Sequence, residues 1–181
     1  MNQSQKRWAE FPILLLLIWV FQGLELSVLR IPFQHGAVQM APVIVVYVAL
    51  TRNWEKLAWL SLFFGFLGSF TVGYSWIVYV AAQFWMGLAA KVFISGFTID
   101  SKISFAFLVS GCVVFSKLLA GFLLKVSGID LLFLYVARDS IFSALASGVL
   151  AYLVYSFFLA WDDYFDHPHI DASEINPDII K

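Results

Sequence analysis

The stretch LAWLSLFFGFLGSFTVGYSWIVYVAAQFWMGLAAKVFI, residues 57–94, decides the fold. It contains a single charged side chain, Lys91. A membrane-spanning helix needs about 20 consecutive apolar residues, so this stretch is too long to be one span. The sequence VGYS at 72–75 is the natural tight turn within it. We therefore predict two spans, at about 57–72 and 75–94.

The rest of the chain has the same character. Of its 181 residues, 61% are hydrophobic and 13% are charged, whereas a soluble domain has roughly 45–50% apolar and about 25% charged residues. This composition excludes an ordinary water-soluble globule. Cys112 is the only cysteine, which excludes an intrachain disulfide scaffold. No basic cluster is large enough to neutralise several phosphates, so we expect no nucleic-acid partner.

Charged or turn-forming residues divide the apolar sequence into six segments, and we predict an all-α integral membrane protein with six transmembrane helices. The predicted spans are about 11–30, 33–50, 57–72, 75–94, 103–124 and 131–161. A cytoplasmic N-terminus, 1–10, precedes this membrane domain, 11–161. An acidic tail, 162–181, follows it and is expected to be disordered. The tail carries six acids and one base, and its net charge is therefore −5.

Lysine and arginine predict the orientation, because they are enriched in the cytoplasmic segments of membrane proteins. With the N-terminus inside, two basic residues fall in outer segments, Arg30 and Lys125. Six fall in inner segments: Lys6, Arg7, Arg52, Lys56, Lys91 and Lys102. We therefore predict that both ends of the chain are cytoplasmic.

Small residues recur at intervals of four in three predicted spans. The sets are Gly65, Ser69 and Gly73; Ser140, Ala144 and Gly148; and Cys112, Ser116 and Ala120. Such spacing places the small residues on one helical face, where another helix can approach closely. The neighbouring helix can belong to this bundle or to another membrane protein. The sequence leaves helix packing and partner docking both open.

Four charges fall within the predicted spans at a distance from their ends: Glu25, Lys117, Arg138 and Asp139. At about 1.5 Å of rise per residue, all four lie roughly 8–12 Å below the outer surface. A charge at depth costs at least about 2.5–3.5 kcal/mol, so we expect Lys117 to pair with Asp139 and Glu25 to pair with Arg138. The set forms either a buried charge network, an outward-facing polar pocket or partner contact, or single side chains that reach the headgroups.

Sequence motifs for catalysis are missing. The chain has no G-x-S-x-G, no Walker loop and no H-E-x-x-H motif. Asp166, His167, His169 and Asp171 could bind a metal weakly, but Pro168 and the acidic surroundings favour a solvated tail. We therefore predict no enzyme activity, no cofactor and no metal.

Two stretches carry a resemblance to a known family. APVIVVYVALTRNWEK at 41–56, followed by LFFGFLGSF at 62–70, resembles the rod shape-determining protein MreD family. That family typically has a proline, an apolar run, tyrosine-x-alanine-leucine, a basic turn and then a glycine-spaced helix. The resemblance covers about residues 30–160. The sequence departs from the family at 69–72, SFTV, where members often carry an acidic residue.

The resemblance implies a non-catalytic subunit of the bacterial cell-elongation complex in the cytoplasmic (inner) membrane. Such a subunit binds an MreC-like single-span protein. Through that protein it supports peptidoglycan synthases and connects them to an actin-like filament. The family is similar in fold to the substrate-binding subunits of energy-coupling-factor transporters. This similarity supplies the alternative, a subunit that captures a vitamin or another small molecule in an outward-facing polar pocket.

Overall fold

A computed structural model of the chain supports the all-α prediction, since every regular element in the described part is helical. The structure describes residues 10, 12–17, 19–20, 40–72, 76–94, 99, 101–129 and 133–165. The helices are α2 (Met40–Thr51), α3 (Trp54–Val72), α4 (Trp76–Ile94), α5 (Lys102–Val126) and α6 (Phe133–Phe165). The described residues between 10 and 20 are helical as well.

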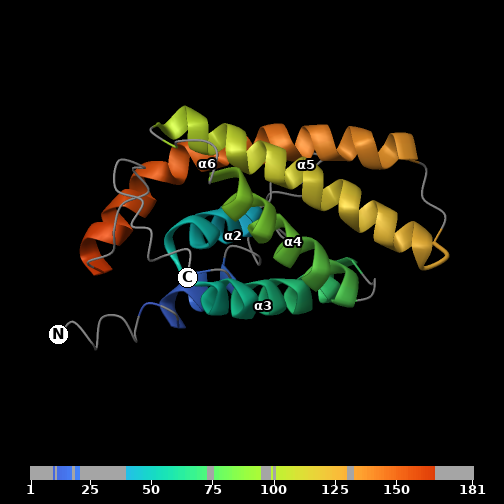
Figure 1. The fold of residues 1–181 in the computed structure, drawn as a ribbon, viewed down its shortest axis with the longest axis horizontal. Coiled ribbons are helices and arrows are strands. Elements are labelled where there is room, and N and C mark those ends of the chain that lie inside the picture. Colours follow the sequence, from blue (N-terminus) through green and yellow to red (C-terminus); the bar gives the residue numbers. More distant parts are fainter. Residues whose placement is uncertain are drawn as a thin grey trace.

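Helix α2 lies at the centre of the bundle. Consecutive helices α3 to α6 run in alternating directions, and α2 packs against all four of them (Figure 1). Its apolar sequence matches this position, because Val43, Val45, Val46 and Tyr47 are fully buried. The most extensive contacts in the bundle lie between α5 and α6, and then between α3 and α4. The short helix α2 therefore forms the core around which two helical hairpins pack.

Helices α5 and α6 are long and apolar enough to cross a membrane. They contain 25 and 33 residues, or about 37 and 50 Å of helix, and a hydrocarbon core is about 30 Å thick. Helix α6 ends at Phe165, four residues beyond the predicted end at Trp161. The expected disordered tail therefore does not begin at Asp162, because this residue is helical and fully buried.

Four of the predicted small residues pack within the chain. A Cβ atom at Gly65 would lie 2.5 Å from the backbone of Val80 in α4. A Cβ atom at Gly148 would lie 2.2 Å from Ser110 Oγ in α5. Ser140 and Ala144, on the same face of α6 as Gly148, are buried. These four positions bring helices of the same chain together, whereas Gly73 and the side chain of Ser69 lie outside the described residues.

Candidate functional site

The most concentrated polar site in the described structure is a buried group of charges, which we call the Arg52 cluster. Its members are Glu10, Tyr47, Arg52, Lys56 and Asp162. Arg52 follows the last turn of α2, whereas Glu10 comes from the first helical segment and Asp162 from the last turn of α6. The exposed fraction of Arg52 is only 3%, and Glu10 and Asp162 are fully buried.

The guanidinium of Arg52 binds two carboxylates. Its Nε and Nη2 atoms donate to Glu10 Oε1 over 2.8 and 2.6 Å, and Nη2 also donates to Asp162 Oδ1 over 2.9 Å. Nη1 donates to the main-chain oxygen of Thr51 over 3.1 Å. Burial alone would lower the pKa of Arg52, but the nearby Tyr47, Glu10 and Asp162 raise it above its usual value. Arg52 therefore stays charged and holds two distant segments against α2.

Tyr47 and Lys56 complete the cluster. The hydroxyl of Tyr47 donates to Asp162 Oδ1 and accepts from Arg52 Nη2 over 3.2 Å. Lys56 Nζ donates to Glu10 Oε2 over 2.9 Å. Two cations thus face two carboxylates, and their formal charges sum to zero. The cluster is suited to holding the first helical segment and α6 against α2, because buried charges are tolerated when they are paired and hydrogen-bonded.

The sequence does not predict this cluster. Arg52 and Lys56 are typical of an inner loop, and Asp162 falls in the predicted tail. One signal in the sequence could have indicated it. The acids Glu10 and Asp162 and the base Arg52 all lie next to predicted inner ends of spans. Sequence spacing could not reveal the pairing, because Arg52 lies 42 residues from Glu10 and 110 residues from Asp162.

The predicted charge set has a different geometry. Lys117 Nζ lies 2.6 Å from Asp139 Oδ2, so the structure brings this expected pair together between α5 and α6. Their side chains are 23% and 25% exposed. Arg138 is exposed and makes no hydrogen bond or ion pair with the described part of the chain. Its expected partner, Glu25, lies outside the described residues.

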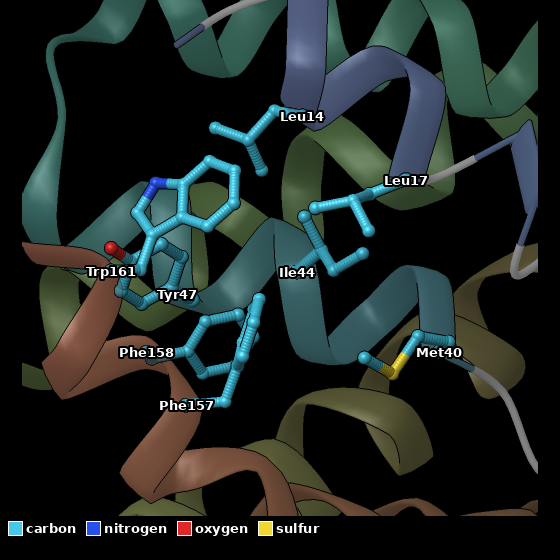
Figure 2. Close-up of a pocket in the computed structure, with 8 residues that line it drawn as sticks. All are labelled: Leu14, Leu17, Met40, Ile44, Tyr47, Phe157, Phe158 and Trp161. Carbon is cyan, nitrogen blue, oxygen red and sulfur yellow. The ribbon is translucent and has the colours of Figure 1, made fainter. Parts of the chain in front are cut away.

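A small apolar pocket adjoins the Arg52 cluster. Figure 2 shows its side chains converging from the first helical segment, α2 and α6. The lining residues are Leu14, Leu17, Met40, Ile44, Tyr47, Phe157, Phe158 and Trp161. The Tyr47 ring stacks on Phe158, with centroids 4.1 Å apart. The pocket can accommodate apolar groups, and its lining presents no charged side chain.

Within the described ranges, no group of three or more histidine, cysteine, aspartate or glutamate side chains could hold a metal ion. The tail residues Asp166, His167, His169 and Asp171 lie outside those ranges. No family model, curated protein or solved structure matches the chain. The geometry of the described residues must therefore carry the functional argument together with the resemblance.

Proposed function

We propose that this chain is a non-catalytic membrane scaffold of the bacterial cell-elongation complex. In this proposal it crosses the cytoplasmic membrane six times with both ends inside. It binds an MreC-like single-span protein and thereby supports peptidoglycan synthases and their connection to an actin-like filament. The lipid bilayer is its solvent, and the protein needs neither a cofactor nor a metal for this role.

One observation carries the proposal: the stretch that resembles the MreD family also forms the centre of the fold. Residues 41–56 include nearly all of α2 and three members of the Arg52 cluster, namely Tyr47, Arg52 and Lys56. The tyrosine and the basic turn of the family pattern thus hold the first and last helices in place. A neutralised, hydrogen-bonded cluster favours a rigid support over a reactive site.

The arrangement of the helices supports the proposed topology. The α2–α3 turn, the end of α4 and the start of α5 lie at one end of the bundle, and the end of α5 and the start of α6 lie at the other (Figure 1). The first end contains Arg52, Lys56, Lys91 and Lys102, as the enrichment of basic residues on the cytoplasmic side requires. Helices α3 and α4 contain 19 residues each, or about 28 Å, which is close to the bilayer thickness of about 30 Å.

The alternative, a small-molecule-binding subunit, has less support. Ligand sites of this kind combine an apolar lining with a few convergent polar groups. The pocket in Figure 2 lies near the proposed inner end, and its lining is apolar and aromatic and includes Tyr47 and Trp161. Lys117 and Asp139 already bind each other. We therefore favour the scaffold.

Depletion of the protein in its bacterial host tests the proposal, which requires that host to be rod-shaped. We expect depleted cells to become round, and we expect the wild-type gene to restore the rods. The protein extracted in mild detergent should co-purify with the MreC-like partner. Retained rod shape would refute the proposal, as would a purified protein that contains a bound vitamin and no partner.

A further inference from the structure

The outer half of α6 has an exposed apolar surface that contains one cation. We call it the Arg138 face, and its members are Leu134, Arg138, Ile141, Phe142, Leu145 and Val149. Relative to Arg138, they lie at intervals of minus four, three, four, seven and eleven. These intervals place them on a single helical face. Leu134 and Leu145 are 82% and 62% exposed, so the rest of the described chain leaves this face open.

The position of Arg138 needs a physical explanation. Arg138 lies five residues after the start of α6, or about 8 Å along the helix. A charged side chain inside a bilayer is costly, and it faces a binding partner or a polar cavity in most membrane proteins. The neighbouring carboxylate of Asp139 already binds Lys117 over 2.6 Å. Among the described residues, no other carboxylate at this level of α6 remains to compensate Arg138.

We propose that the Arg138 face binds a transmembrane helix of a partner protein that carries a carboxylate at the level of Arg138. This inference rests on the proposed function and specifies where the partner binds and which group recognises it. The predicted outer segments contain four bases, Arg30, Lys117, Lys125 and Arg138, and three acids, Glu25, Asp130 and Asp139. The excess positive charge complements an acidic side chain.

The shape of the face agrees with a helix as the occupant. The apolar residues from Ile141 to Val149 continue the line below Arg138 over about 12 Å. Lipid tails are as apolar as these side chains, so helices in membranes associate through close packing and specific polar pairs. Arg138 supplies the polar pair, and Phe142, Leu145 and Val149 supply the packing surface. An anionic lipid would place its headgroup at Arg138 and its acyl chain along the same line, and the crosslinking experiment separates that outcome from a protein helix.

Photo-crosslinking in living cells tests the inference on the full chain. A photoreactive amino acid replaces Leu145, which is 62% exposed, and the control replaces Phe107 of α5, which is 74% exposed. We expect position 145 to capture one single-span protein whose crosslinked helix contains Asp or Glu, and position 107 to capture none. Arg138→Glu should reduce capture at least about tenfold, because like charges then face each other. The Arg138→Lys variant should retain capture, because it keeps the positive charge. When the partner's acidic residue is replaced by arginine, the Arg138→Glu variant should capture it again, because the charge pair is then restored in reverse.

Three results would overturn the inference. They are lipid adducts alone at position 145, a captured helix without a carboxylate, and undiminished capture by Arg138→Glu at wild-type protein levels. The inference would also be overturned if a second substitution, Glu25→Arg, restored capture by the Arg138→Glu variant, because the anion that pairs with Arg138 would then belong to this chain. Capture of an acidic single-span protein that is unrelated to MreC would sustain the inference and refute the proposed function. If the MreC-like protein co-purifies equally well with the Arg138→Glu variant, the proposed function is sustained and the inference about the Arg138 face is refuted.

Discussion

Arg52 Nη2 lies 2.9 Å from Asp162 Oδ1, although 110 residues separate the two positions in the chain. The same guanidinium binds Glu10, so one side chain at the end of α2 joins the first and last described helical segments. Apolar packing alone gives little directional preference between membrane helices, because lipid is also apolar. This buried ion pair therefore specifies how α6 docks on α2.

Replacement of Arg52 by methionine should destabilise the protein strongly. Glu10 and Asp162 would lose their shared cation, and loss of one partner from a buried ion pair costs about 3–5 kcal/mol. We expect a large fall in the amount of folded protein in the membrane and a lower midpoint of unfolding in detergent. Arg52→Lys should cause a smaller loss, because it keeps the charge but lacks the planar fork. Wild-type stability of Arg52→Met would contradict the structural role of the cluster.

The Lys117–Asp139 pair should behave as a coupled unit. Lys117→Met leaves Asp139 without its cation and should lower the amount of folded protein. The double variant Lys117→Met with Asp139→Asn removes both charges and should recover part of the loss. Membrane fractions and unfolding midpoints of the singles and the double measure the coupling. A double variant no better than the worse single would exclude a stabilising pair.

Gly65 and Gly111 form a matched pair of glycine positions. At Gly65 a methyl group would overlap the Val80 backbone, whereas at Gly111 it would meet no atom within 4 Å. We expect Gly65→Ala to destabilise the protein by about 1–3 kcal/mol through overpacking. Gly111→Ala should be neutral or stabilising by up to about 1 kcal/mol, since alanine is the better helix former. Unfolding midpoints of the two variants give the comparison, and equal midpoints would disprove close packing of α3 on α4.

Reporter fusions test the six-span topology. Fusions after Lys56, Ser101 and Lys181 should report the cytoplasm. Fusions after Gln34 and Ser127 should report the outside. The expectation follows from the excess of lysine and arginine in the segments assigned to the inner side. A periplasmic signal at Lys181 would rule out an even number of spans.

The sequence predicted the helices because breaks in an apolar chain are easy to recognise. Arg52, Glu55 and Lys56 mark the turn between α2 and α3, and the VGYS stretch marks the division between α3 and α4. The predicted spans 57–72 and 75–94 agree with α3 and α4 to within three residues. The pairing of Lys117 with Asp139 followed from a shared depth, because two adjacent antiparallel helices place equal depths side by side.

The Arg52 cluster could not be predicted in the same way. A sequence at a span boundary does not distinguish a solvated charge from one that folds inward, and that choice depends on which helix ends meet. The rotation of α6 about its own axis determines which of its two adjacent charges faces α5. Asp139 faces Lys117, and Arg138 remains exposed. Their shared depth in the sequence predicts one network for both charges, because depth carries no information about the rotation of the helix about its axis.

The length of α6 has a mechanical consequence. Its 33 residues measure about 50 Å, roughly 20 Å more than the hydrocarbon thickness of a bilayer. A helix longer than its bilayer tilts or extends into the interface, and its tilt follows the local thickness. Asp162 holds the C-terminal end of α6 at Arg52, and Lys117 holds the N-terminal half of α6 to α5, so α5 and α6 would tilt together at the end away from Arg52. Thickening or thinning of the membrane would thus reorient Arg138 about a pivot at the opposite end of the same helix.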